Sequence, residues 1–141
     1  MDKALVLKKL EALSTCIGRI ESKRPAEPGV LRQDRDLQDI ITINLERAVQ
    51  VCVDVATHLI ADTAHRSPET MSECFAELRS MGVLSDALAT RLQKAVGFRN
   101  IAVHEYQEID WDVVFSIITK HLGDFRAYAA AVLDHCGLAR E

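Results

Sequence analysis

The sequence predicts an all-α fold, an antiparallel bundle of four to five helices, on three observations. Hydrophobic residues recur every three or four positions over long stretches, which is the period of a helical face. No stretch of useful length alternates with the period of a β-strand. The segments between the expected helices are of moderate length, which favours antiparallel packing. A chain of 141 residues can bury its own core, so a single domain is expected over residues 1–141.

The first helix is expected over residues 2–23, because apolar residues repeat there at alternating spacings of four and three. This apolar face consists of Val6, Leu10, Leu13, Ile17 and Ile20. Pro25 follows the helix and ends it, since proline lacks an amide donor and restricts the residue before it. The segment of residues 23–33 carries more basic than acidic residues. We expect it to be a solvated loop, with a modest anion-attracting surface as the alternative.

The second helix is expected over residues 34–64, and Asn44 is the one polar member of its apolar face. A buried asparagine without hydrogen-bond partners costs about 1–3 kcal/mol. Two interpretations therefore stay open, an asparagine satisfied locally in a core or interface, and one that lines a functional site. Asp54 and His58 are four residues apart and could pair on one edge of the helix. A metal site would need a third ligand, and none stands at a recognisable spacing.

Capping signals place the remaining helices. Residues 70–73, Thr-Met-Ser-Glu, form a capping box that opens a short helix, and Gly82 ends that helix. Ser85 is a suitable N-cap for the fourth helix. Asp110 is a suitable N-cap for the last helix, expected over residues 111–136. These signals complete the five helices of the expected bundle.

Composition limits the class of function. The formal net charge of -4 gives no general attraction to nucleic acid, so any such function must rest on a local patch. The four cysteines show no CxxC spacing. Cys52 and Cys136 fall on apolar faces, so we expect their thiols to be buried, in a reducing, cytoplasmic compartment. We see neither a signal-peptide core nor an apolar run of about 20 residues, so no membrane segment is expected. His121 falls on the apolar face of the last helix and is expected to be a core histidine rather than a ligand. No cofactor and no metal is predicted.

The strongest functional signal lies at the end of the fourth helix, in residues 99–106. On a wheel of about 100° per residue, Arg99 falls in the middle of the apolar face of this helix. A guanidinium is almost never fully buried without a partner. The face should therefore open at Arg99 onto a cleft, a subunit interface or a partner charge. Asn44, similarly out of place, and Asn100 are expected to support that cleft.

His104 follows Arg99 by five residues, which places it about 140° around an unbroken helix. The two side chains would then not converge on one small ligand within one chain. Either the helix ends near residues 102–104 and the chain turns the imidazole back, or two copies contribute to one site across a two-fold axis. We favour a combination, a symmetric site at the end of the helix. Tyr106, seven residues after Arg99, would return to its side if the turn persisted.

Arginine and histidine together suit metal-independent cleavage of RNA. The guanidinium fork matches phosphate oxygens, and the imidazole titrates near neutral pH. Two facing histidines could deprotonate a ribose 2′-hydroxyl and protonate the 5′-oxygen leaving group, while Arg99 stabilises charge on phosphorus. Arg91 and Lys94 add positive charge to this helix, and no acidic residue lies between Asp86 and Glu105. A bland alternative fits the same spacing, a helix C-terminus whose basic residues complement the helix dipole.

The run of residues 97–106, Gly-Phe-Arg-Asn-Ile-Ala-Val-His-Glu-Tyr, contains the spacing Arg-x4-His-x-Tyr and resembles the HEPN superfamily, most closely its HepT toxin branch. Residues 37–39, Leu-Gln-Asp, and residues 52–58, Cys-Val-Asp-Val-Ala-Thr-His, resemble the second helix of that branch. The resemblance covers nearly the whole chain, although only the central motif is specific.

This resemblance implies a helical bundle that forms a homodimer, with two Arg/His motifs in a shared cleft. It implies a metal-independent endoribonuclease, the toxin of a bacterial toxin–antitoxin pair, with Arg99 and His104 as catalytic residues. The implied antitoxin is a small MntA-type nucleotidyltransferase that transfers AMP from ATP onto Tyr106. A bulky, negatively charged adenylate beside the cleft would exclude an anionic substrate. Two alternatives remain, a non-catalytic HEPN module that binds a nucleotide or a partner, and a domain whose Tyr106 is merely modified.

Overall fold

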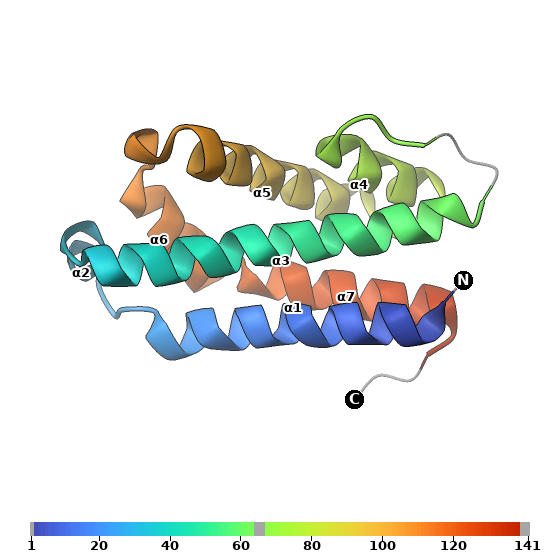
Figure 1. The fold of residues 1–141 in the computed structure, drawn as a ribbon, viewed down its shortest axis with the longest axis horizontal. Coiled ribbons are helices and arrows are strands. Elements are labelled where there is room, and N and C mark those ends of the chain that lie inside the picture. The colour runs from blue at the N-terminus through green and yellow to red at the C-terminus, as the bar shows by residue number, and fades with distance from the viewer. Residues whose placement is uncertain (1, 64–66, 139–141) are drawn as a thin grey trace.

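The chain, described here by a computed structural model for residues 2–63 and 67–138, is all-α, as predicted. In these ranges it forms α1 (Lys3–Lys23), α2 (Pro28–Gln33), α3 (Arg35–Ala61), α4 (Met71–Ser80), α5 (Asp86–His104), the 3-10 turn η1 (Tyr106–Glu108), α6 (Trp111–Lys120) and α7 (Leu122–Cys136). The long helix α3 runs between α1 and α5, and α7 lies behind it (Figure 1). The bundle is confirmed, but the described chain has more helices than the four to five expected.

The two longest helices, α1 and α3, begin and pack as the sequence indicates. Asp2 and Asp34 cap them, each accepting a hydrogen bond of 3.0 Å from a backbone amide of the first turn. All five residues of the predicted apolar face of α1 are buried. The two helices pack along their lengths, α1 below α3 in Figure 1. This pairing forms one side of the bundle and leaves an outer ridge of α3 exposed.

The segment of residues 23–33 is not wholly a solvated loop, which corrects that expectation. Pro28 takes the first position of α2, where its missing amide proton is no disadvantage. Leu31 is fully buried, and its carbonyl accepts a 2.9 Å hydrogen bond from the side chain of Gln38 in α3. Arg32 pairs with Asp112 of α6 at 2.7 Å. Burial of Leu31 therefore holds in place a segment whose composition predicted a loop.

The last expected helix is divided at His121 into α6 and α7, and the predicted core histidine is wrong. The backbone at His121 leaves helical geometry, with φ -121° and ψ 3°. Its imidazole is exposed and lies 3.6 Å from the carboxylate of Asp124. Ile118 and Leu122 supply the buried contacts on either side of the break. This break changes the angle at which α7 begins relative to α6. His121 therefore lies outside the buried face, although the sequence pattern places it there.

The predicted capping box and the predicted cap at Ser85 hold, with one change of partner in the capping box. The Thr70 hydroxyl accepts from the amide of Glu73 at 3.2 Å, while the Glu73 carboxylate accepts from the amide of Glu69 instead of closing back on Thr70. Gly82 follows α4 with a φ of 79°, a conformation that favours glycine. The Ser85 hydroxyl accepts from the amide of Leu88 at 3.2 Å and opens α5. The helix that carries the central motif thus begins where predicted.

In the interior, Tyr128 of α7 joins that helix to α3 and α4. Its hydroxyl donates a 2.7 Å hydrogen bond to the carbonyl of Cys52 in α3, and its ring meets that of Phe75 edge to face at 6.0 Å. All four cysteines are free and buried, Cys52 and Cys136 as predicted, and burial raises the pKa of each thiol. Across residues 2–63 and 67–138, no helix is both long and apolar enough to cross a bilayer.

Candidate functional site

The central motif lies where α5 ends. The helix extends to His104, and Glu105 closes it by donating its amide proton to the carbonyl of Ile101 at 2.8 Å. The chain then turns into η1, which begins at Tyr106. This confirms an end close to the predicted one. Because His104 is itself helical and exposed, its side chain remains about 140° around the axis from that of Arg99.

Arg99 lies against α3 and is half-buried, as its position on the apolar face predicted. Its Nη2 donates to the side-chain oxygen Oε1 of Gln50 at 3.3 Å. Its Nε is shielded from solvent and has no hydrogen-bond acceptor among the described residues. No carboxylate of the described chain forms an ion pair with it. Arg99 therefore keeps its positive charge available at the junction of α3 and α5.

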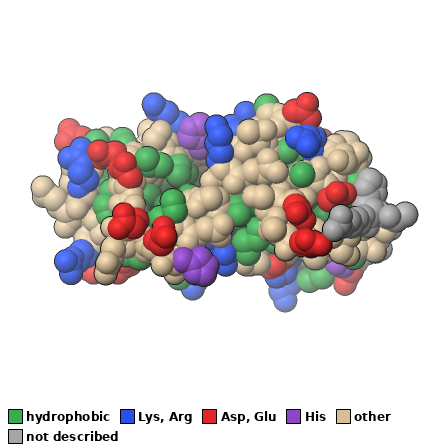
Figure 2. Space-filling model, turned by 90° about the horizontal axis from the view of Figure 1, so that it is seen from above, with side chains coloured by type: hydrophobic (Ala, Val, Ile, Leu, Met, Phe, Trp, Pro, Cys, Tyr) green, Lys and Arg blue, Asp and Glu red, His purple; other side chains and the backbone are tan. Residues whose placement is uncertain are grey.

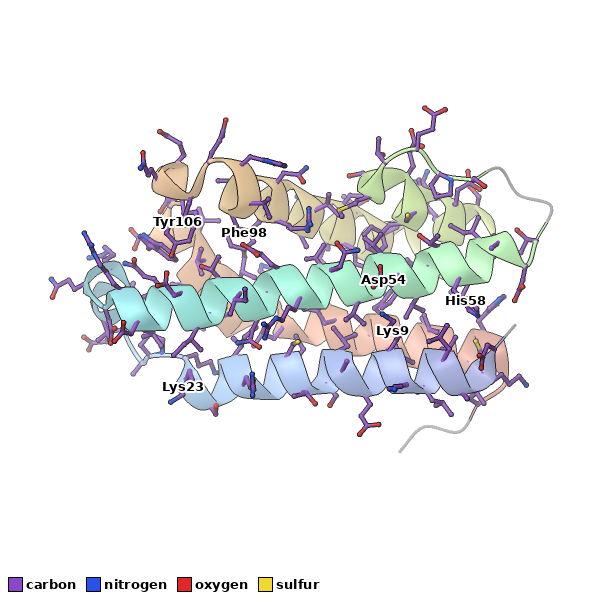
Figure 3. The ribbon with its side chains drawn as sticks, viewed as in Figure 1. Lys9, Lys23, Asp54, His58, Phe98 and Tyr106 are labelled. Atoms are coloured by element: carbon purple, nitrogen blue, oxygen red, sulfur yellow. The ribbon has the colours of Figure 1, made fainter. Side chains whose placement is uncertain are left out.

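Gln50 was not anticipated, and it links Arg99 to the far side of α3. Its Nε2 donates to Oδ1 of Asp54 at 2.9 Å, and Oδ2 of Asp54 accepts from Lys9 of α1 at 3.2 Å. Figure 3 shows Lys9 and Asp54 between α1 and α3. A carboxylate can only accept, so Asp54 holds the Gln50 amide with its oxygen toward Arg99. The four-residue spacing of Gln50 and Asp54 was the available sequence signal.

The predicted pair of Asp54 and His58 is not formed. The imidazole Nε2 of His58 instead accepts a hydrogen bond from the backbone amide of Asp2 at 3.2 Å, at the start of α1. Asp54 is engaged by Lys9 and Gln50. A search of residues 2–63 and 67–138 finds no group of three or more His, Cys, Asp or Glu side chains able to hold a metal ion. Both residues of this pair have structural roles between α1 and α3.

Tyr106 of η1 also reaches back to α3. Its hydroxyl donates a short 2.6 Å hydrogen bond to Oδ1 of Asp39, and its ring packs edge to face on Trp111 at 5.9 Å. Partial burial, followed by the hydrogen bond and the negative charge of Asp39, raises the pKa of Tyr106 to about 12. Asp39 was anticipated only as part of the Leu-Gln-Asp stretch of α3. Its role depends on a contact across 67 positions of the chain.

The two predicted supporting residues differ in position. Asn100 is exposed beside Arg99. Asn44 is 2% exposed, and its amide nitrogen donates to the carbonyl of Ile40 at 2.8 Å within α3. It lies about 160° around the helix axis from Glu46, on the opposite side of α3 from the contacts to Tyr106 and Arg99. The structure does not bring Asn44 to Arg99. Asn44 is a core residue bonded locally through its amide nitrogen, and its Oδ1 is buried with no hydrogen-bond partner among the described residues.

The two contacts from α5 and η1 to α3 bracket one surface, which we call the α3–α5 face. At about 100° per residue, Asp39, Ile43, Glu46 and Gln50 fall within about 60° of one another on α3. Arg99 and Tyr106 contact this side of α3, and Val103 follows Arg99 by one turn of α5. Ile43 and Val103 are large apolar side chains, yet 43% and 45% exposed. Two carboxylates, Asp39 and Glu46, lie toward the Tyr106 end, and the guanidinium lies toward the other end. This face combines apolar surface with separated charges, a composition suited to binding another molecule.

The other basic residues of α5 do not extend this face. Arg91 pairs with Asp124 of α7 at 2.9 Å, and with Lys94 it lines a groove of about 540 Å³ between α5, α6 and α7. On the face seen in Figure 2, basic and acidic side chains are interspersed instead of forming one broad basic patch. The expected contribution of Arg91 and Lys94 to one cationic surface with Arg99 is therefore not seen.

Comparisons with known proteins agree with this geometry. The model of the family "Ribonuclease HepT-like" matches residues 13–132. The chain is 32% identical over 124 residues to the mRNA nuclease HepT of Shewanella oneidensis, covering 88% of this chain and 92% of that protein. It is 30% identical over 96 residues to the tRNA nuclease HepT of Aphanizomenon flos-aquae, covering 67% of this chain and 65% of that protein.

Solved structures show the same fold. A tri-AMPylated HEPN toxin of Shewanella oneidensis in complex with an MNT antitoxin superposes with a TM-score of 0.87 at 30% identity, covering 95% of this chain and 99% of that one. The cytosolic protein YutE of Bacillus subtilis, at 14% identity and a TM-score of 0.82, supports the fold alone. The bundle, with Arg-x4-His-x-Tyr at the end of a core helix, defines a HEPN-type domain. The chain belongs to the HepT-like ribonuclease family.

Proposed function

We propose that this protein is the toxin of a bacterial toxin–antitoxin pair and acts as a metal-independent endoribonuclease. The observation that carries the proposal is the state of Arg99, half-buried at the α3–α5 face with no carboxylate partner in the described chain. Its membership of a ribonuclease family gives that free charge a substrate class, the phosphates of RNA. The two nucleases of the family compared above act on mRNA and on tRNA, so the proposal extends to RNA as a class.

The active site is proposed to form between two copies of the chain. Within one chain, Arg99 and His104 point about 140° apart around α5 and cannot both contact one phosphate from the same face. Ile43 and Val103 expose apolar surface beside Arg99, and a second copy would cover it. A two-fold axis at this face would present the arginines and histidines of both copies to one cleft, with Asn100 at its edge.

The proposed reaction follows from these side chains. One His104 removes the proton of a ribose 2′-hydroxyl, whose oxygen attacks the adjacent phosphorus. The other His104 protonates the 5′-oxygen that leaves. Arg99 donates hydrogen bonds to the oxygens that gain negative charge in the transition state. Arg99 and His104 are thus the proposed catalytic residues, and the chemistry needs proton donors and acceptors that the chain itself supplies.

The partner is proposed to be a nucleotidyltransferase antitoxin that attaches AMP to Tyr106. The related Shewanella toxin is AMPylated and bound to an MNT antitoxin, and the motif tyrosine of this chain is 40% exposed. Tyr128, the second tyrosine, is fully buried and hydrogen-bonded, so it is a poor acceptor. We place the protein in the cytoplasm, in keeping with its free thiols, and treat residues 1–141 as one functional domain.

RNA cleavage in EDTA tests the proposal. The purified toxin, free of antitoxin, should cleave RNA in the chelator, whereas Arg99→Ala and His104→Ala should each lose at least about a hundredfold in rate. Mixed dimers of wild type and His104→Ala should also fail to cleave, because the proposed step uses the imidazoles of both copies as base and acid. Full activity of His104→Ala, or loss of cleavage in EDTA, would refute the mechanism. Growth arrest by the double variant would favour a non-catalytic binding module.

A further inference from the structure

The short hydrogen bond between Tyr106 and Asp39 affects the chemistry of the Tyr106 hydroxyl. A phenol donates its proton directly to a carboxylate at 2.6 Å, and the two groups come from η1 and α3. Trp111 holds the phenol ring from the other side through an edge-to-face contact. Although the hydroxyl is engaged, the Tyr106 side chain is 40% exposed. The phenol proton is therefore directed to a carboxylate while part of the side chain remains open to solvent.

A phenol in this state is a weak nucleophile without help. Burial and the Asp39 carboxylate raise the pKa of Tyr106 to about 12, so only about one molecule in 100,000 carries a phenolate at pH 7. A hydroxyl that attacks phosphorus needs a base within hydrogen-bond reach of its proton. Oδ1 of Asp39 already occupies that position. The aspartate that keeps the resting phenol protonated is also the group placed to take the proton when the oxygen reacts.

We propose that Asp39 is the general base for attachment of AMP to Tyr106. This inference rests on the proposed function, since it needs the nucleotidyltransferase and ATP. In the step, Oη of Tyr106 forms a bond to the α-phosphorus of ATP. The bond from that phosphorus to the oxygen bridging the β-phosphate breaks, and pyrophosphate leaves with the electron pair. The phenol proton passes to Oδ1 of Asp39 and then to solvent.

The same pair of residues also makes the product leave its starting position. Once AMP is attached, Oη has no proton to donate, and the phosphodiester adds a negative charge beside Asp39. Glu46, which also acts electrostatically on Tyr106 from α3, adds a second repulsion. The modified side chain therefore turns away from α3. Attachment of the first AMP therefore breaks the hydrogen bond between Tyr106 and Asp39 that assisted it.

Intact-mass kinetics with the purified cognate antitoxin and ATP test the proposal. Asp39→Asn keeps a hydrogen-bond acceptor but not a base, and the kcat of the first AMP addition should fall about a hundredfold with KM for ATP unchanged. Asp39→Glu returns a carboxylate and should recover to within about tenfold of wild type. Glu11→Gln removes one negative charge from the exposed side of α1, away from the α3–α5 face, and should stay near the wild-type rate.

The outcomes separate this inference from the proposed function. AMP addition to Tyr106→Phe at the wild-type rate would refute Tyr106 as the acceptor, and with it that part of the proposed function. If Tyr106→Phe is inert while Asp39→Asn reacts at the wild-type rate, only the role of Asp39 is refuted. Equal slowing of Asp39→Asn and Glu11→Gln would refute the base in favour of a general effect of charge. A raised KM for ATP with unchanged kcat would refute it in favour of a docking charge.

Discussion

Removing the Gln50 side chain should slow RNA cleavage without weakening RNA binding. In Gln50→Ala, Nη2 of Arg99 loses its acceptor at 3.3 Å, and Oδ1 of Asp54 loses its donor at 2.9 Å. A hydrogen bond to a charged group contributes about 1.5–3 kcal/mol, and the length and partial exposure of this one place it near the lower limit. If that energy holds the guanidinium in its reactive position, kcat falls about tenfold.

Initial rates on a defined RNA, measured over a range of substrate concentrations, separate kcat from KM. The matched control is Gln93→Ala, because Gln93 also bridges helices, donating to the carbonyl of Ser72 at 3.1 Å, but it does not contact Arg99. Asp54→Asn should give a smaller fall, since the amide of Gln50 is then free to turn over. Wild-type kcat in Gln50→Ala, or the same loss in Gln93→Ala, would show that Gln50 does not position Arg99.

Three further predictions concern the tyrosines and a glycine. In a spectrophotometric titration, Tyr106 should stay protonated until about pH 12, and Asp39→Asn should ionise earlier. The pKa of Tyr106 in the folded protein exceeds the usual value near 10, so the stability that this residue contributes is complete below pH 10 and is lost as the pH rises toward 12. A tyrosinate signal at pH 10 in the folded protein would contradict this. Tyr128→Phe should lower the free energy of unfolding in urea by about 1–2 kcal/mol, since a buried carbonyl loses its donor, and an unchanged midpoint would disprove it. Gly82→Ala should cost about 1 kcal/mol at a φ of 79°, whereas Gly123→Ala within α7 should not destabilise; equal melting temperatures of the two variants would count against backbone strain at Gly82.

The sequence was most informative where one helix decided the outcome. The half-buried position of Arg99 followed from its angle on α5, because a helical period is a local property. The caps at Ser85 and Asp110 followed in the same way, since a capping side chain bonds to an amide two or three residues on. In each case a few consecutive residues contained all the participants.

The contacts that give the site its detail join distant segments, and no local pattern reports them. Asp39 meets Tyr106 across 67 positions, and Gln50 meets Arg99 across 49. Their pairing depends on how α5 lies against α3, which is fixed only when the whole core packs. The misplaced His121 has a related cause, since one non-helical residue shifts every later position of a periodic pattern. Tertiary packing, not helix propensity, decided these points.

On one side of the 27-residue helix α3, two residues, here called anchors, each hold in place a side chain of the proposed site. Asp39 fixes the hydroxyl proposed to accept AMP, and Gln50 fixes the guanidinium proposed to act on RNA. Eleven residues separate them, which is about 16 Å along a helix axis. A helix does not stretch over such a distance, so a slide or rotation of α3 displaces both anchors together. Mutations that loosen the buried side of α3 should therefore impair RNA cleavage and its inhibition in parallel, and escape from the antitoxin alone should arise at the Asp39 end.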